Sequence, residues 1–148
     1  MDTKWILKKF EELTPHELYA ILHLRNEVFV VEQNCVYQDA DNKDQSSFHF
    51  MAWQEEKLLA YTRILPAGIA FDMVSIGRVV TSPGVRRTGM GKELMIRSIE
   101  EVQKLYGKVP IWIGAQLYLK EFYNSLGFQQ SSSIYLEDGI EHIEMILS

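Results

Sequence analysis

The segment from residue 74 to residue 115 constrains the fold of this 148-residue chain more than any other part of it. It begins with a β-branched run, Val74–Val80, and passes through a short turn that contains glycines. A long amphipathic pattern then stops at Gly107, and a second apolar run, Val109–Ala115, follows. A strand, a helix and a strand in this order predict two neighbouring parallel strands joined by a right-handed crossover.

The helix of this unit has the clearest pattern in the chain. Its apolar side chains recur at helical spacing and are Leu94, Met95, Ile99, Val102 and Leu105. Charged and amide side chains take the opposite side, and Gly107 stands where a C-cap is expected. The helix should therefore bury one side against a sheet.

Outside this unit the pattern alternates between strands and helices. Thr14 and Pro15 suit the start of a first helix, and Gly127 suits the end of a short one that begins near 118. Strands are expected over 5–10, 48–53 and 58–64, with two or three more between 128 and 147 around a turn at 137–139. The sequence thus predicts an α+β (mixed α/β) fold with helices packed on a mixed sheet, in one domain over 1–148.

Composition excludes several classes of protein. A net charge of −5 argues against general nucleic-acid binding, which needs an electropositive surface. No apolar run approaches the ~20 residues of a membrane-spanning helix, and the N-terminus lacks the apolar core of a signal peptide. Cys35 is the only cysteine, which fits a reducing compartment. We expect a cytoplasmic protein that binds neither nucleic acid nor membranes and whose edge strands could pair in a homodimer.

The turn before the central helix has the features of an anion site. Gly89 and Gly91 remove side chains where the helix begins, so backbone N–H groups and the positive helix end face the turn. Three cations and a hydroxyl donor lie beside it: Arg86, Arg87, Lys92 and Thr88. In an acidic chain, this basic cluster indicates a small anionic ligand.

Two familiar phosphate motifs do not fit this turn. The Walker pattern begins at Gly84 and Gly89, but it then needs Lys and Ser or Thr where the chain has Met90 and Gly91. The dinucleotide pattern needs a glycine at Leu94. A P-loop and a Rossmann fingerprint are therefore excluded.

The hexapeptide Arg86-Arg87-Thr88-Gly89-Met90-Gly91 resembles motif A of the GNAT superfamily of N-acetyltransferases, [QR]-x-x-G-x-[GA]. The resemblance implies a GNAT-like central sheet that is mixed but mostly antiparallel, with a β–α–β unit that binds acetyl-CoA. It also implies the residues that contact this co-substrate: Val79, Val80, Arg86, Arg87, Thr88, Gly89, Met90, Gly91 and Lys92.

Two further segments extend the resemblance. The segment Gln116–Phe128 is similar to motif B of the family, which ends F-Y-x-x-x-G-F. The tyrosine of that motif commonly protonates the departing CoA thiolate, which implies this role for Tyr123. The family usually has Asn seven residues earlier, against the pantetheine; Gln116 keeps the amide and lengthens its reach.

The segment 24–37 resembles the ElaA-like branch, whose acceptor this resemblance does not define.

The chemistry also needs a base, because an alkyl amine with a pKa near ~10.4 arrives protonated. Glu32 is the first candidate, since the ElaA-like segment implies a place near the acceptor; Glu27 and His49 are alternatives. Glu32 could equally be a surface or salt-bridged carboxylate. Arg25 and Arg78 could bind an acidic group of the substrate or serve as structural ion-pair partners.

The sequence therefore predicts an acetyl-CoA-dependent N-acetyltransferase that acts on a primary amine of a small molecule or peptide by direct attack in a ternary complex. A backbone N–H near Val79 or Val80 could stabilise the developing oxyanion. Two alternatives stay open: a catalytically silent CoA-binding sensor, or transfer of another acyl group or to a hydroxyl. No metal is expected, because the four histidines lack ligand spacing.

Overall fold

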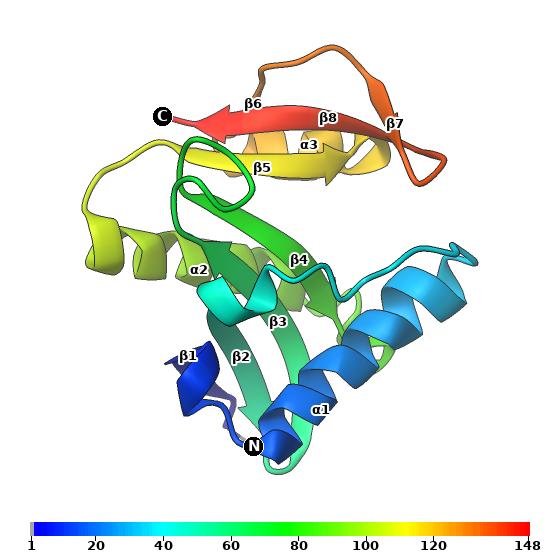
Figure 1. The fold of residues 1–148 in the computed structure, drawn as a ribbon, viewed down its shortest axis with the longest axis vertical. Coiled ribbons are helices and arrows are strands. Elements are labelled where there is room, and N and C mark those ends of the chain that lie inside the picture. The colour runs from blue at the N-terminus through cyan, green and yellow to red at the C-terminus, as the bar shows by residue number, and fades with distance from the viewer. Residues whose placement is uncertain (1) are drawn as a thin grey trace.

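The chain forms one eight-stranded sheet with helices on both faces (Figure 1). The computed structural model describes residues 2–148. The strands are β1 (Lys4–Lys9), β2 (Phe48–Gln54), β3 (Lys57–Leu65), β4 (Ser75–Thr81), β5 (Ile111–Gln116), β6 (Gln129–Gln130), β7 (Tyr135–Glu137) and β8 (Ile140–Leu147). Their order is β1-β2-β3-β4-β5-β8-β6, with β7 also paired to β8. Every pairing is antiparallel except that of β4 with β5, so the predicted mixed, mostly antiparallel sheet is confirmed.

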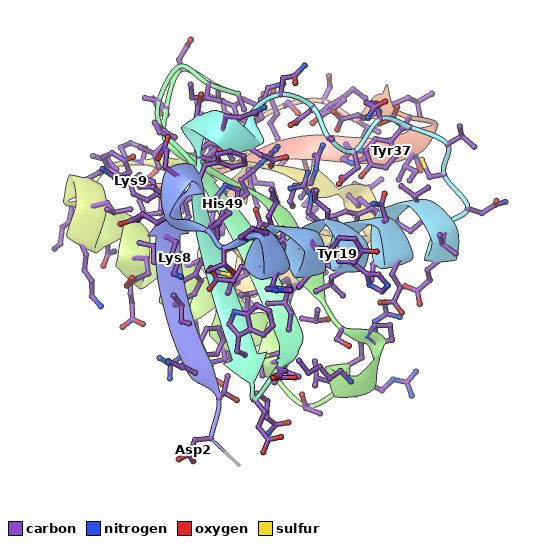
Figure 2. The ribbon with its side chains drawn as sticks, turned by 60° about the horizontal axis from the view of Figure 1, so that its bottom comes forward. Asp2, Lys8, Lys9, Tyr19, Tyr37 and His49 are labelled. Carbon is purple, nitrogen blue, oxygen red and sulfur yellow. The ribbon has the colours of Figure 1, made fainter. Side chains whose placement is uncertain are left out.

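Helix α1 (Pro15–Arg25) covers one face of the sheet. Thr14 accepts a hydrogen bond from the Glu17 backbone N–H, and the Glu17 side chain accepts one from the Thr14 N–H, so the helix begins with a capping box as the sequence indicates. Its buried side chains, among them Ile21, pack against β2 and β3. Figure 2 shows α1 lying across these strands with Tyr19 on its outer side. The helix continues as a π-helix, η2 (Asn26–Glu32), which the sequence did not reveal.

Helices α2 (Met90–Tyr106) and α3 (Lys120–Ser125) cover the other face. In α2 the predicted apolar stripe is buried at Leu94, Met95 and Val102, and it fades at Leu105, which is 37% exposed. The helix ends at Gly107, whose positive φ of 78° suits a glycine after a C-terminus. A short 3-10 turn, η5 (Leu117–Leu119), precedes α3, so the expected helix near 118–126 is split in two.

The predicted parallel neighbours, β4 and β5, are paired at one position only, Ser75 with Trp112. Beyond that point β4 and β5 diverge, while the other edge of β5 pairs with β8 along its whole length (Figure 1). A β-bulge contributes to this divergence: Arg78 and Val79 lie opposite the single residue Thr62 of β3. An extra residue bends a strand and raises its twist, which a run of β-branched residues does not reveal.

The C-terminal hairpin returns to the open end of this gap. Its turn is formed by Asp138 and Gly139, with φ of 53° and 79°, and confirms the turn expected from the sequence. The Asp138 carbonyl accepts a contact of 3.6 Å from the Cys35 thiol, just after η2. Two segments distant in sequence therefore meet there. Within residues 2–148, no helix is both long enough and apolar enough to cross a membrane.

Candidate functional site

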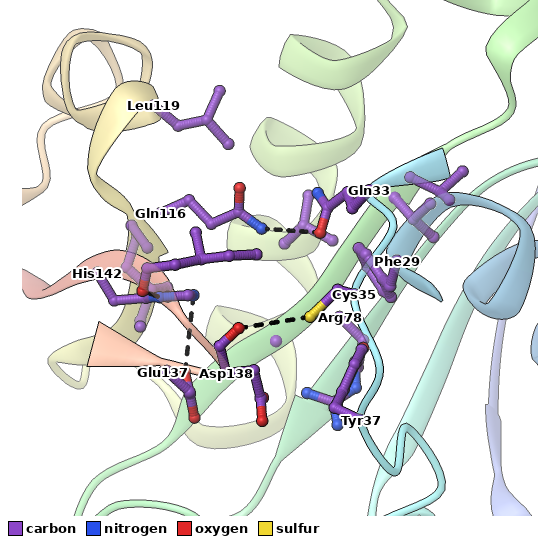
Figure 3. Close-up of a pocket in the computed structure, with 18 of the residues that line it drawn as sticks. Phe29, Gln33, Cys35, Tyr37, Arg78, Gln116, Leu119, Glu137, Asp138 and His142 are labelled. Atoms are coloured by element: carbon purple, nitrogen blue, oxygen red, sulfur yellow. Dashed lines mark hydrogen bonds and ion pairs between the residues drawn. The ribbon is translucent and has the colours of Figure 1, made fainter. Parts of the chain in front are cut away.

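The gap between β4 and β5 is a cavity of about 790 Å³. Its walls come from both diverging strands, the end of η2 with the loop after it, η5 and α3, and the β7–β8 hairpin (Figure 3). Seven residues expected at the site from the sequence line it: Glu32, Arg78, Val79, Val80, Arg86, Gln116 and Tyr123. The cavity therefore joins residues of both sequence motifs.

The β4 edge supplies backbone groups to the cavity. Because the ladder with β5 stops at Ser75, the peptide groups of β4 beyond it, around Val79 and Val80, are left facing the gap. Arg78 has a φ of 50°, in the left-handed region that residues other than glycine rarely adopt. Non-glycine residues in such conformations cluster at functional sites, and here the strained residue lies in the cavity wall.

The turn before α2 depends on glycine for its backbone conformation. Gly89 is the N-cap of α2 with a φ of 86°, a conformation that favours glycine. Gly91 has open space around its Cβ position, so a ligand could approach the backbone there. Gly89 and Lys92 also line a shallow hollow of about 480 Å³. Thr88, expected as a donor, gives its hydroxyl hydrogen to the Val85 carbonyl instead.

Tyr123 lies on α3 and is only 5% exposed. Its ring is held edge-on by Phe122 and Phe128, at centroid distances of 5.1 and 6.0 Å. Burial raises the pKa of the Tyr123 phenol above its ordinary value, so the group keeps its proton at neutral pH. A protonated, rigid phenol on the cavity wall can donate that proton to a leaving group.

Gln116 ends β5 and reaches across the cleft. Its Nε2 donates to the Oε1 atom of Gln33 at 3.4 Å, which links β5 to the segment after η2 (Figure 3). The longer side chain that replaces the asparagine usual in the family is therefore accommodated.

Glu32 and Arg86 form an ion pair at the exposed rim of the cavity. The two carboxylate oxygens of Glu32 accept hydrogen bonds from the two Nη atoms of Arg86. These hydrogen bonds lower the pKa of Glu32 and weaken it as a base. Of the two interpretations left open by the sequence, the salt-bridged carboxylate describes Glu32 in this structure.

Arg25 is a structural residue. Its side chain is fully buried, and it does not line the cavity. The Nε atom binds Asp39 Oδ2 at 2.7 Å and Nη1 binds Asp44 Oδ1 at 2.7 Å. The ion-pair alternative for Arg25 therefore fits the structure, and the substrate-binding alternative does not.

Arg78 extends the same network to the cavity wall. Its Nε lies 2.9 Å from Asp39 Oδ1, and its Nη2 lies 3.3 Å from Asp41 Oδ2. Arg63 binds Asp41 and Asp44 from the sheet side, at 2.8 and 2.9 Å. The guanidinium of Arg78 faces the cavity, but its charge is already matched by these carboxylates. The network holds the loop that carries Asp39, Asp41 and Asp44 against the sheet.

The two alternative bases lie outside the cavity lining. His49 is fully buried on β2, with Nδ1 2.6 Å from the Tyr61 hydroxyl and Nε2 2.9 Å from the Asp44 carbonyl. Burial lowers the pKa of His49, so its ring stays neutral and serves the core. Glu27 is exposed on η2.

Sequence reasoning missed several lining residues. They come from the loop after η2, from η5 and from the C-terminal hairpin, and include Cys35, Tyr37, Tyr118, Glu137, Asp138, Ile140 and His142. The hairpin turn was predicted, but strand periodicity does not reveal which loop a turn will face. Within residues 2–148, no group of three His, Cys, Asp or Glu side chains could hold a metal ion.

A family model described as "Acetyltransferase (GNAT) domain" matches residues 11–148. This chain belongs to the GNAT superfamily. It is 41% identical over 144 residues to the protein ElaA of Escherichia coli strain K12, covering 96% of this chain and 94% of that one. The chain is thus an ElaA-like GNAT protein. Membership of this family supports a general function in acyl-CoA-dependent acyl transfer.

Solved structures agree with this family assignment. An acyl-CoA N-acyltransferase from Pseudomonas aeruginosa superposes with a TM-score of 0.95 at 42% identity, covering 99% of this chain and all of that one. Escherichia coli ElaA gives a TM-score of 0.93 at 39% identity, again over 99% and 100%. An aminoglycoside 6'-N-acetyltransferase complexed with coenzyme A shares the fold at 17% identity, with a TM-score of 0.69 over 95% of each chain.

Proposed function

We propose that this GNAT protein transfers an acetyl group from acetyl-CoA to a primary amine of a small molecule or peptide by direct attack in a ternary complex. The observation that carries the proposal is the cavity that lies between β4 and β5 and is lined by Tyr123. It offers a backbone edge and a proton donor, and Arg86 from the basic turn before α2 also lines it.

The chain offers hydrogen-bond donors and positive charges that suit an acyl-CoA. The pyrophosphate would be held by the N–H groups at the start of α2, with Arg86 and Lys92 supplying positive charge. Gln116 and the free edge of β4 offer amide partners for the pantetheine arm. In support of this fit, the turn carries little side-chain bulk at Gly89 and Gly91. The P. aeruginosa homologue is named an acyl-CoA N-acyltransferase, which favours the same donor class.

The bound donor supplies an acyl thioester, and the chain supplies alignment and proton transfer. Backbone N–H groups of the β4 edge near Val79 and Val80 would stabilise negative charge on the acyl oxygen. Tyr123 Oη, which its raised pKa keeps protonated at neutral pH, would give its proton to the departing sulfur. Holding amine and thioester together in one cavity contributes much of the rate.

The test begins with calorimetric titration of the purified protein with acetyl-CoA, using NAD and ATP as controls. Selective binding of acetyl-CoA is expected. Arg86→Glu should weaken it by about 10- to 100-fold, because a charge-assisted hydrogen bond contributes roughly 1.5–3 kcal/mol. Lys104→Glu is the matched control, because it makes the same charge change on α2. The Lys104 side chain is 76% exposed and lines neither the β4–β5 cavity nor the shallow hollow.

Turnover then decides between the candidate functions. Transfer is measured with acetyl-, propionyl- and butyryl-CoA and a panel of primary amines and alcohols. Fastest transfer of acetyl to an amine supports the proposal. Binding without any turnover would leave a silent CoA-binding module, and failure of a folded sample to bind acetyl-CoA would overturn the proposal entirely.

A further inference from the structure

His142 combines the position and the hydrogen bonding of a catalytic base. It lies on β8 and lines the cavity, with 12% of its side chain exposed. Nδ1 is 2.7 Å from the Ile140 carbonyl oxygen. Because a carbonyl oxygen only accepts, Nδ1 carries the hydrogen, and the neutral ring keeps its lone pair on Nε2. The ring stacks on Tyr135 at 5.9 Å, which fixes its orientation.

The lone pair on Nε2 is not used by a short hydrogen bond. The carboxylate of Glu137 lies 3.6 Å from Nε2, beyond hydrogen-bonding range (Figure 3). In contrast, Glu32 is engaged by Arg86 through both oxygens, and His49 is closed off through both ring nitrogens.

His142 and Tyr123 approach the cavity from opposite faces of the sheet. Ile143 and Met145 of β8 point into the core that contains Tyr123. Since side chains alternate along a strand, His142 points to the other face. Both residues nevertheless line one cavity, because the gap between β4 and β5 opens through the sheet. An amine could therefore enter from one face while the thiol leaves toward the other.

The charged groups beside His142 on β7, β8 and the turn between them are acidic, whereas Lys43, Arg78 and Arg86 line other parts of the cavity. Glu137 on β7 and Asp138 in the following turn line the same cavity, and Glu144 follows on the same side of β8. On the neighbouring strand β5, the residue opposite His142 is Gln116, whose side-chain amide is neutral. Arg78 faces the cavity from β4, where Asp39 and Asp41 match its charge. A protonated amine would be attracted to this wall.

We propose that His142 is the general base of the transfer reaction and that its wall of the cavity selects acceptors arriving as ammonium ions; this rests on the proposed function. Nε2 of His142 takes the proton from the ammonium group. The amine nitrogen then forms its bond to the acyl carbon, and the bond from that carbon to sulfur breaks. The sulfur leaves with the electron pair and receives the Tyr123 proton. The nitrogen loses its second proton through water to the Tyr123 phenolate, which leaves a neutral amide, and His142 passes its proton to water.

The decisive variant is His142→Gln, which keeps a hydrogen-bonding side chain and removes the base. His23→Gln is the control, because His23 is exposed on α1 away from the cavity. The acceptors are benzylamine, spermidine and lysine amide, which arrive protonated, and hydroxylamine, which is largely unprotonated near pH 7. With the alkyl amines, His142→Gln should lower kcat/KM at pH 7 by about 10²- to 10⁴-fold. With hydroxylamine the loss should stay within about 3-fold, since no base is needed.

The pH profile and the tautomer give independent readouts. For an alkyl amine, the ascending limb of kcat/KM should lie at higher pH in His142→Gln than in the wild type, because the amine must then lose its proton without a base in the cavity. In the free protein, a long-range proton–nitrogen NMR spectrum should show the His142 ring with hydrogen on Nδ1. The signal is assigned by its absence in His142→Gln.

Three results would overturn the proposal. Alkyl-amine turnover by His142→Gln within 3-fold of wild type would remove His142 as the base while leaving the acetyltransferase function standing. A neutral ring protonated on Nε2 would remove the orientation argument. No turnover of any of these amines by the wild-type protein would overturn the proposed function, and this inference with it.

Discussion

Arg25→Met should destabilise the fold severely while sparing the cavity. The substitution keeps most of the side-chain volume and removes a buried guanidinium with three hydrogen bonds, to Asp39 Oδ2, Asp44 Oδ1 and the Asp39 carbonyl. Removing one partner of a buried ion pair costs roughly 3–5 kcal/mol, because the other charge stays buried. Here Asp39 keeps Arg78 and Asp44 keeps Arg63, so the lower end, about 3 kcal/mol, is expected.

Thermal and urea unfolding measure this loss. For a chain of this size, about 3 kcal/mol corresponds to a fall in Tm of roughly 6–12 °C. Lys104→Met is the control, because Lys104 pairs with Glu101 at the surface with 76% of its side chain exposed. Such pairs contribute below ~1 kcal/mol. The acetyl-CoA Kd of Arg25→Met at 10 °C should stay near the wild-type value, because Arg25 does not line the cavity. A Tm within 2 °C of wild type would refute the structural role of Arg25.

Three further predictions concern Tyr123, the glycine turn and Asp41. Tyr123→Phe should lower kcat by about 10²-fold or more and leave the acetyl-CoA Kd within about 2-fold; an unchanged kcat would remove the phenol as the acid. Gly89→Ala should cost about 1–2 kcal/mol in urea unfolding because of the positive φ, whereas Gly91→Ala, inside the first turn of α2, should stabilise slightly. Burial opposes ionisation of Asp41, but Arg63 outweighs it and lowers the folded pKa below the model-peptide value of 3.8. Stability present above about pH 4 should therefore fall as the pH drops further, and Asp41→Asn should flatten this fall in acid urea titrations.

Local patterns were sufficient to predict most elements of the fold. The Thr14-Pro15 start of α1, the Gly107 end of α2 and the Asp138-Gly139 turn are each decided by residues within a few positions, so the sequence identifies them directly. The crossover unit was predicted correctly in order and type. The extent of pairing between β4 and β5 was not predicted, because it depends on a bulge opposite Thr62 that no short sequence pattern reveals.

The sequence predicted the residues on the acyl-donor side of the candidate site better than those on the acceptor side. Arg86, Gly89 and Tyr123 belong to short motifs, and two of them line the β4–β5 cavity while Gly89 caps α2 at the shallow hollow. His142 lies in no motif, and its relevance depends on a hairpin that folds back against the loop after η2. Glu32 was predicted as the base because it lies in the ElaA-like segment 24–37. Its ion pair with Arg86, 54 residues away, could not be predicted from the sequence.

The incomplete pairing of β4 with β5 is what allows one sheet to present chemistry from both faces. A sheet paired along its whole length separates its two sides, because backbone hydrogen bonds fill the space between strands. Here the ladder stops after Ser75, and the opening is bordered by Tyr123 from the core side and His142 from the other. An acid and a base on opposite sides can each meet its own partner without exchanging a proton directly. Divergence of these strands, rather than any single side chain, is therefore the feature on which the proposed division of roles depends.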